Sequence, residues 1–248
     1  MMSTPSRVDA HCHVDLLDNW QEVIRKLERR AQFTLAVTTT PKAWATEQEF
    51  ARHCRYVRIG VGLHPQVVRE RMAELPLLER AIGDSRFVGE VGLDASPMHK
   101  DSLPDQRKVL GRVFSVCTEV RGRVLSLHSL RAAGLILEML EETKVHETNT
   151  IIFHWFTGSA SELKRALSMG AKISVNADML RTERGRSHAR MAGPECTLTE
   201  SDAPFTRVHS SVDGVPNMEP AINALAECWG VSVPVAMSSV AHLAHRYW

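Results

Sequence analysis

The sequence predicts an α/β protein folded as a single (β/α)8 TIM barrel over residues 1–248, and three observations support this. Short apolar runs alternate along the chain with segments of helical periodicity, which is typical of β-α-β units around a parallel sheet. There are eight such runs, the number that closes a barrel. The length of 248 residues is close to the roughly 250 that such a barrel uses. An open, doubly wound sheet is the alternative that this alternation also allows.

The predicted strands follow one another at fairly regular intervals. They cover residues 8–13, 33–40, 56–64, 87–93, 124–129, 150–156, 171–176 and 196–202. Apolar side chains that recur every three or four residues predict helices over residues 20–27, 105–120, 135–140, 220–229 and 234–248. The segment 179–193 follows the seventh strand and is polar and rich in arginine, which favours a loop over a helix.

The composition excludes several classes of protein. With 30 Lys+Arg against 29 Asp+Glu and 44% hydrophobic residues, the chain lacks the high net charge and low hydrophobicity of disordered proteins. No apolar run approaches the about 18 residues of a transmembrane helix, and residues 1–7 lack the apolar core of a signal peptide. The five cysteines form no CxxC pair, so we expect free thiols in a reducing compartment. These features predict a cytoplasmic protein with no membrane partner.

Histidine is the residue type whose positions are most informative. The first predicted strand ends in His11-Cys12-His13, and side chains at i and i+2 of a strand share one face. In a barrel we expect that face to be the interior, with both imidazoles pointing at one spot and Cys12 packing outward. Two buried neutral imidazoles without a partner are costly. A metal ion is the usual resolution.

Polar side chains also interrupt or end four later apolar strands. Glu90 lies between glycines in the fourth strand. His128, His154 and Asp202 end the fifth, sixth and eighth strands. Each would lie at the carboxyl-terminal rim of the barrel, where barrel enzymes place their sites. A hydrogen-bonded polar group at a strand end explains any one of these residues, but not a set of six from five different strands.

Four imidazoles and two carboxylates are enough ligands for two divalent metal ions. Ions a few Å apart normally share a ligand, and Glu90 is the natural bridge. Two ions lower the pKa of a bound water and stabilise charge on the attacking and leaving oxygens, and Asp202 can accept the proton of that water. Glu90 and Asp202 are therefore the predicted catalytic carboxylates. Mixed nitrogen and oxygen ligands suit Zn, Mn or Ni by preference and Mg with more difficulty, and the sequence does not choose among Mg, Mn and Zn.

These residues stand in an ordered set of motifs. The motifs are Asp9-Ala10-His11-Cys12-His13-Val14-Asp15, Gly62-Leu63-His64-Pro65, Gly89-Glu90-Val91-Gly92-Leu93-Asp94, the strand-end His128, His154-Trp155-Phe156-Thr157-Gly158 and Glu200-Ser201-Asp202-Ala203-Pro204. In this order, and over nearly the whole chain, they resemble the TatD family of metal-dependent deoxyribonucleases in the amidohydrolase superfamily. The resemblance implies hydrolysis of phosphodiesters in DNA, often as an exonuclease on single strands, with a metal-activated water attacking phosphorus.

The resemblance also implies a role for each residue. One metal ion would be held by His11, His13, Glu90 and Asp202, and the second by Glu90, His128 and His154. His64 would correspond to the family histidine that contacts a substrate phosphate. The partner would be DNA, as a single strand or a strand end. A net charge near zero argues only against a broad basic surface that coats duplex DNA, since metal ions in a pocket supply positive charge of their own.

The sequence departs from the family pattern after Asp94. Many TatD proteins have an aromatic pair and an Arg there, whereas this chain has Ala95-Ser96-Pro97-Met98-His99-Lys100. The substrate-contacting Arg or stacking ring of the family is therefore missing at this place. The motifs Ser126-Leu127-His128-Ser129 and His154-Trp155-Phe156-Thr157-Gly158 are closer to QatD, the TatD-like subunit of the Qat anti-phage defence systems. That resemblance implies a role in antiviral defence with other Qat subunits as partners.

Arginines after the seventh strand offer a further contact with substrate. Residues 179–190 carry four arginines and one glutamate, and from this position Arg181 and Arg184 would overhang the site and bind phosphates. The alternatives are a solvated loop or a contact with a partner. Trp155 follows a candidate ligand and would either stack on a base or pack outward.

Two other functions stay open for the same residues. An amidohydrolase or D-aminoacyl-tRNA deacylase would use the same two-metal site on a different bond. Glu90 stands where the carbamylated-lysine enzymes of that superfamily have a lysine, which favours the nuclease-like branch. A non-catalytic subunit of a defence complex would keep the metal for stability alone.

Overall fold

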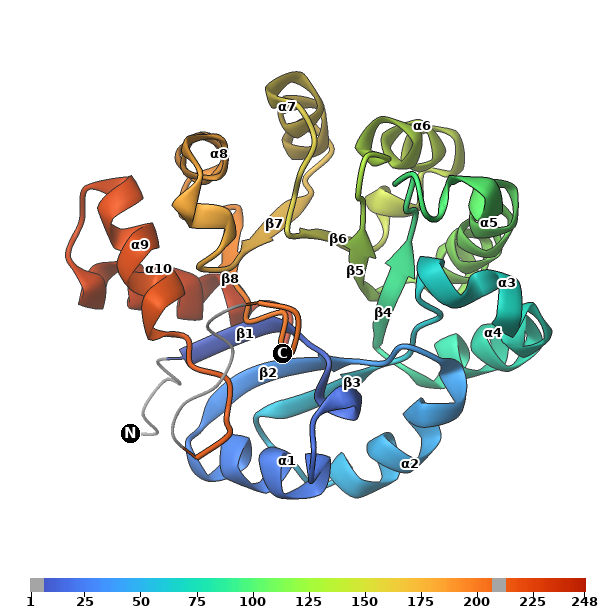
Figure 1. The fold of residues 1–248 in the computed structure, drawn as a ribbon, viewed down its shortest axis with the longest axis horizontal. Coiled ribbons are helices and arrows are strands. Elements are labelled where there is room, and N and C mark those ends of the chain that lie inside the picture. The colour runs from blue at the N-terminus through green and yellow to red at the C-terminus, as the bar shows by residue number, and fades with distance from the viewer. Residues whose placement is uncertain (1–6, 207–212) are drawn as a thin grey trace.

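In the computed structural model, parallel strands form a ring with helices on its outside (Figure 1). The structure describes residues 7–206 and 213–248. The strands are β1 Arg7–Cys12, β2 Gln32–Val37, β3 Val57–Gly60, β4 Phe87–Gly92, β5 Val124–His128, β6 Thr150–His154, β7 Lys172–Val175 and β8 Thr197–Thr199. Strands β1 to β3 form one parallel sheet and strands β4 to β8 form another, and in each sheet the strands are paired in sequence order.

Hydrogen bonds join the edges of the two sheets at both places where they meet. Between β3 and β4, Gly89 N donates to Val61 O (2.8 Å). Between β8 and β1, Asp202 N donates to His11 O (2.9 Å). The ring is therefore closed, so the predicted (β/α)8 fold is confirmed and the open sheet is excluded.

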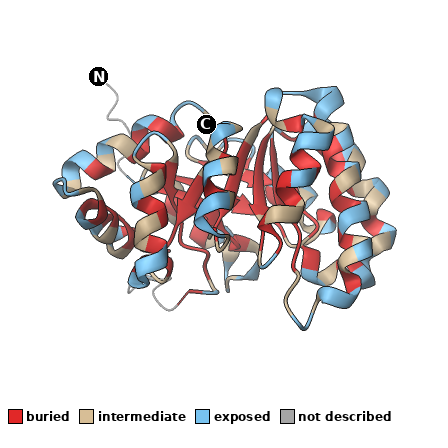
Figure 2. Ribbon diagram, turned by 90° about the horizontal axis from the view of Figure 1, so that it is seen from above, coloured by how far each residue is buried: buried red, intermediate tan, exposed pale blue. Residues whose placement is uncertain are grey.

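The helices alternate with the strands and cover the outside of the ring. They are α1 Trp20–Arg29, α2 Pro41–Ala51, α3 Val68–Arg71, α4 Leu75–Asp84, α5 Leu103–Val120, α6 Ala133–Thr143, α7 Ala160–Ser168, α8 Glu183–Ala192, α9 Glu219–Trp229 and α10 Val233–Ala244. Each long helix buries one side against the strands and exposes the other, as Figure 2 shows. The five cysteines are free, and Cys12 packs outward against α1, as predicted.

The loop predicted over 179–193 is wrong, because most of this segment is helix α8. Thr182 caps the helix by accepting a hydrogen bond from Gly185 N (3.0 Å). The buried side of α8 consists of Gly185, His188, Ala189 and Ala192, not of large aliphatic residues. A Cβ on Gly185 would lie only 2.0 Å from Met179 O, so the close approach requires a glycine. Small residues and a histidine carry little of the apolar periodicity on which the prediction relied.

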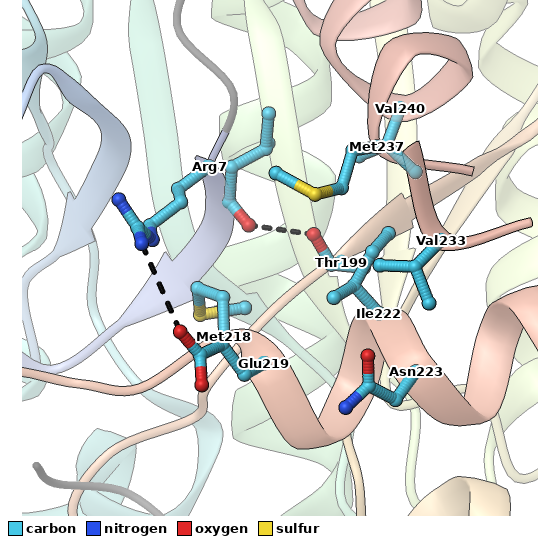
Figure 3. A pocket seen from close by; sticks show the side chains of 10 residues that line it. Arg7, Thr199, Met218, Glu219, Ile222, Asn223, Val233, Met237 and Val240 are labelled. Carbon is cyan, nitrogen blue, oxygen red and sulfur yellow. Dashed lines mark hydrogen bonds and ion pairs between the residues drawn. The ribbon is translucent and has the colours of Figure 1, made fainter. Parts of the chain in front are cut away.

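A cavity of about 240 Å³ lies between the start of β1, β8 and the last two helices (Figure 3). Arg7 forms an ion pair with Glu219 at its edge (3.8 Å), and Thr199 Oγ1 donates to Val8 O (2.6 Å). The rest of its lining is mostly aliphatic, and the described residues place no cluster of histidines or carboxylates there. This cavity therefore presents no candidate metal site among the described residues.

Within the described ranges, no single helix is long and apolar enough to cross a membrane. Helices α9 and α10 are long and apolar enough for a span only when they are taken together. The pair is bent by 104° at the break between the two helices. The location of the protein stays a prediction.

Candidate metal centre

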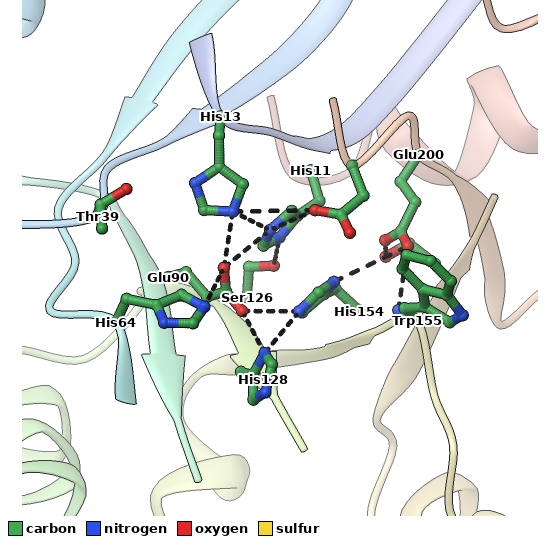
Figure 4. Close-up of polar contacts among 12 residues, drawn as sticks. His11, His13, Thr39, His64, Glu90, Ser126, His128, His154, Trp155 and Glu200 are labelled. Atoms are coloured by element: carbon green, nitrogen blue, oxygen red, sulfur yellow. Dashed lines mark hydrogen bonds and ion pairs between the residues drawn. The ribbon is translucent and has the colours of Figure 1, made fainter. Parts of the chain in front are cut away.

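The carboxyl ends of the strands bring all six predicted ligands and His64 together. Figure 4 labels these residues except Asp202. His11 and Glu90 lie within β1 and β4, and His128 and His154 are the last residues of β5 and β6. His13, His64 and Asp202 follow β1, β3 and β8 in the adjoining loops. We call these seven residues the Glu90 cluster, because every imidazole in it faces that carboxylate.

The two oxygens of Glu90 face different pairs of rings. Oε2 lies 2.8 Å from His13 Nε2 and 3.2 Å from His11 Nε2. Oε1 lies 2.8 Å from both His128 Nδ1 and His154 Nε2. A carboxylate whose oxygens face different pairs of rings could be shared by two metal ions, and the four rings would supply nitrogen ligands.

Two glycines let the backbone approach these side chains closely. A Cβ on Gly62 would lie 2.2 Å from Glu90 N and 2.4 Å from Thr38 O. Gly92 has a φ of +148°, and a Cβ there would lie 2.1 Å from His128 O. Only glycine fits either position, so the glycines of the motifs help to fix where Glu90 and His128 project.

Several rings are held from behind by a second polar group. His11 Nδ1 is 2.7 Å from Ser126 Oγ. His128 Nε2 is 3.2 Å from Asp94 Oδ2, leaving its Nδ1 for Glu90. Outer partners of this kind set the tautomer and orientation of a metal-binding histidine.

Glu200 is a functional candidate that the sequence reasoning missed. Its Oε1 lies 3.8 Å from His154 Nδ1, and it accepts hydrogen bonds from Trp155 N (3.1 Å) and Asn176 Nδ2 (2.9 Å). Ser174 Oγ donates to its other oxygen. Glu200 is therefore a buried, well-anchored carboxylate behind a candidate ligand. Its place two residues before Asp202 within the predicted strand 196–202 could have indicated this role.

Replacing Glu200 with Gln should loosen His154 without removing a predicted ligand. We expect metal affinity and activity to fall by about 10- to 100-fold, the usual effect of losing an outer partner of a metal ligand. Metal titration by calorimetry would measure this, with the exposed Glu195→Gln as the matched control. An affinity equal to that of the wild type would show that Glu200 does not orient His154.

The ionisation of the rings differs across the cluster. Burial, and then the neighbouring His154, lower the pKa of His11 to about 3, so this ring is neutral near pH 7. Burial opposes protonation of the others too. Even so, Glu90 together with nearby carboxylates raises the pKa values of His13, His128 and His154. Protons therefore occupy part of the cluster when no cation does, and a bound cation would displace them.

The carboxylates are shifted in opposite directions. Burial opposes ionisation of Glu90, but the surrounding His64, His154 and His11 outweigh it and hold its pKa well below the usual range. Burial raises the pKa of Asp202 to about 7, and the nearby charges of Glu200 and Glu90 add to this. One carboxylate is thus always ionised, and the other can exchange a proton near neutral pH.

The donor atoms of the cluster fit a divalent metal ion. Glu90 Oε2 is buried and close to two ring nitrogens, yet it meets hydrogen-bond geometry with no described residue. His11 Nε2 and His13 Nε2 are 3.3 Å apart and lie 3.7 and 3.8 Å from Asp202 Oδ1. These atoms converge on a shared space, and their lone pairs become available to a cation once the protons are displaced. Buried nitrogen and oxygen donors in this number suit Zn or Mn.

His64 is arranged as a hydrogen-bond donor. Its Nδ1 accepts a hydrogen bond from Gln66 N (3.2 Å), so the neutral ring carries its proton on Nε2. That nitrogen lies 3.3 Å from Glu90 Oε2, and burial lowers the pKa of the ring. A ring in this tautomer can donate to a phosphate oxygen but offers no lone pair on Nε2 to a metal.

The Glu90 cluster opens into a cavity of about 360 Å³, which we call the site cavity. It is lined by His13, His64, Gln66, Glu90, His128, Ser129, Leu130, His154, Trp155, Thr157, Asp202 and Phe205. Polar groups thus form one part of the cavity wall, and Leu130, Trp155 and Phe205 form an apolar part. A cavity of this size accommodates a small organic ligand or one unit of a polymer.

The structure does not bring Arg181 or Arg184 into the site cavity. Arg181 is exposed and lies 3.6 Å from Asp178 Oδ1. Arg184 Nη2 donates to Gly158 O (2.6 Å) and to Thr157 O. A phosphate contact by either side chain would require it to leave these partners, and that role stays a prediction.

Comparisons with known proteins identify the family of the chain and agree with its fold. A family model described as TatD related DNase matches residues 8–248. The deoxyribonuclease Tat-D of Schizosaccharomyces pombe is 27% identical over 81% of this chain, and the match spans 60% of that protein. The metal-dependent hydrolase YcfH of Escherichia coli K12, itself uncharacterized, is 25% identical over 95% of this chain and 91% of its own length.

Solved structures agree on the fold. The crystal structure of YjjV, a TatD homologue from Escherichia coli K12, matches with a TM-score of 0.84 at 20% identity and covers 99% of both chains. An amidohydrolase of Saccharomyces cerevisiae, also uncharacterized, matches with a TM-score of 0.77 at 15% identity over 98% of this chain and 99% of that chain. Since the family model covers nearly the whole sequence, the chain belongs to the TatD related DNase family and is a hydrolytic enzyme.

Proposed function

We propose that residues 1–248 form a single TatD-like hydrolase domain that cleaves phosphodiester bonds in DNA, taking single strands or strand ends. The observation that carries this proposal is Glu90, which is buried between two pairs of imidazoles at the base of an open cavity. The family match and the relative named as a deoxyribonuclease support DNA as the substrate class.

The cofactors of the proposed enzyme are two divalent ions, of Mg, Mn or Zn. The residues that would hold them are His11, His13, Glu90 and Asp202 for one ion, and Glu90, His128 and His154 for the other. When bound, such ions lower the pKa of a water and stabilise the charge that develops on phosphate oxygens.

The remaining chemistry belongs to side chains of this protein. Asp202 would accept the proton of the attacking water and later release it. His64 would donate its Nε2 proton in a hydrogen bond to a non-bridging oxygen of the phosphate, which holds phosphorus in line with the attack. Glu90, whose pKa lies well below the usual range, would stay ionised and hold the surrounding imidazole rings in position.

Cleavage of labelled oligonucleotides tests the proposal. The metal-stripped protein, reloaded with Mg, Mn or Zn, should shorten single strands from an end faster than it cuts duplexes. We expect Asp202→Asn to lower kcat by about 100-fold, since a general base contributes at least that factor. The exposed Asp84→Asn serves as the control.

Other outcomes, with D-aminoacyl-tRNAs added as a second class of substrate, would refute the proposal or favour another function. Equal cleavage by the wild type and Asp202→Asn would refute the assignment. Hydrolysis of D-aminoacyl-tRNA without any cleavage of DNA would favour the deacylase alternative. Metal binding without hydrolysis of either substrate would favour a non-catalytic subunit.

We also propose a QatD-like role in anti-phage defence, with other Qat subunits as partners. The sequences of residues 126–129 and 154–158, which resemble the corresponding QatD motifs, support this proposal. If this is correct, the neighbouring genes should encode an ATPase and a QueC-like protein. Cells that carry the whole gene cluster should lose phage resistance when Asp202→Asn replaces the wild type. Resistance that survives this change would separate defence from hydrolysis.

A further inference from the structure

We propose that Phe205 forms a nucleobase-stacking subsite beside the Glu90 cluster, so that the nucleotide at the site is held by its base as well as by its phosphate. This inference rests on the proposed function, because it takes the ligand to be a polynucleotide end. It assigns a substrate contact to a residue outside the six predicted ligands, and at a different place from the missing family ring after Asp94.

The exposure of Phe205 is the first observation. Its ring is 58% exposed, and among the large hydrophobic residues that are exposed in ranges 7–206 and 213–248 it is the only aromatic one. It is also the only one of that group that lines the site cavity. An exposed aromatic ring in the apolar part of the cavity wall offers a flat face on which a ligand with its own flat apolar face can stack.

The position of the ring is the second observation. Phe205 N donates to Asp202 O (2.7 Å), so the turn after β8 fixes this residue next to a predicted ligand. The ring meets His13 edge to face, with centroids 5.2 Å apart and an interplanar angle of 86°. A substrate phosphate at the Glu90 cluster would thus have Phe205 within the span of one nucleotide, and the exposed part of the ring is available for stacking.

A buried hydroxyl in the same cavity is the third observation. Ser129 is only 3% exposed, and its Oγ has no hydrogen-bond partner among the described residues. It lines the site cavity directly after His128. An unpaired buried hydroxyl calls for a polar partner, which a water or a ligand would supply. A ligand with both an aromatic face and polar atoms would therefore fit the cavity. A nucleoside has both features, whereas a simple phosphate ester lacks the aromatic face.

Stacking on an aromatic side chain is sequence-tolerant, because every base has a π-face. The subsite would therefore favour a base without choosing which base. It also requires a base that has left its pair, since one inside a duplex is already stacked on both sides. Phe205 would in this way select single strands and frayed ends over continuous duplex.

Three substitutions of Phe205, one control variant and two substrates test the inference. Phe205→Ala should raise KM for a single-stranded oligonucleotide by about 10- to 100-fold, while kcat changes little. With an abasic residue at the stacking position, the wild type should be as weak as Phe205→Ala. Phe205→Trp should restore KM, whereas Phe205→Leu, which keeps apolar bulk without a π-face, should not. Val235→Ala, which removes exposed apolar surface on α10, should match the wild type.

A binding assay separates the failure of this inference from the failure of the proposed function. An oligonucleotide with terminal 2-aminopurine should lose fluorescence on binding the wild type and keep it on binding Phe205→Ala. Quenching without cleavage would keep the subsite and refute the phosphodiesterase. Cleavage with equal KM values for the wild type, Phe205→Ala and Phe205→Leu would refute the subsite and keep the enzyme. No binding at all would refute both.

Discussion

Glu90→Gln should abolish most of the activity, with cleavage falling by about 1,000-fold or more. The carboxylate lies within 3.3 Å of a nitrogen of every ring in the cluster. An amide of the same shape loses the negative charge and has only one acceptor oxygen. Both ions would therefore lose their shared ligand, and a loss of several kcal/mol of charge stabilisation corresponds to at least this factor in rate.

Metal content and kinetics should be measured on the same samples of Glu90→Gln. We expect less than the wild-type content of bound metal, and no recovery of kcat at high metal concentration. Glu74→Gln is a suitable control, because it also alters a buried carboxylate but one that pairs with Arg71 and Lys42. If Glu90→Gln keeps full metal content and activity, the carboxylate is not a bridge and the two-ion proposal is wrong.

The residues of the cluster were predictable because their chemistry conflicts with their surroundings. A charged Glu90 within an apolar strand and an HxH motif on another have no packing explanation, and closing a barrel brings such strand ends together. The spacing of apolar runs was enough to predict the eight strands, although most observed strands are shorter than their apolar runs. As a result, His64 and Asp202 lie in loops after β3 and β8.

The contacts that the sequence did not indicate join segments that are far apart in the chain. Ser126 supports His11 across 115 residues, and no local pattern shows this contact. The hydrogen-bond partners of Arg184 are carbonyl oxygens of another loop. The sequence shows the charge of this side chain but not these hydrogen bonds. Helix α8 was missed for a related reason, since its buried side is made of small residues that fit only because a neighbouring segment lies close.

Glu47→Gln should give the largest change in stability, and the change should depend on pH. Glu47 lies on α2, is 3% exposed, and its Oε2 has no hydrogen-bond partner among the described residues. Burial, and then the nearby charge of Asp15, raise its pKa from 4.5 to about 8. Between these two values the folded state holds a proton that the unfolded state has released. Stability should therefore fall as pH rises, by up to about 1.4 kcal/mol per pH unit.

Glutamine cannot ionise, so the variant should lack this decline. The two proteins should be similarly stable at pH 4.5 and below. The variant should be more stable by roughly 4 kcal/mol at pH 8, where the wild type must either bury a charge or unfold. Urea unfolding at intervals from pH 4.5 to 8.5 measures both curves. Glu49→Gln, exposed on the same helix and paired with Arg52, controls for the loss of a carboxylate from α2. Parallel curves for the wild type and Glu47→Gln would mean that Glu47 ionises as easily in the folded protein as in the unfolded chain, and that its burial carries no electrostatic cost.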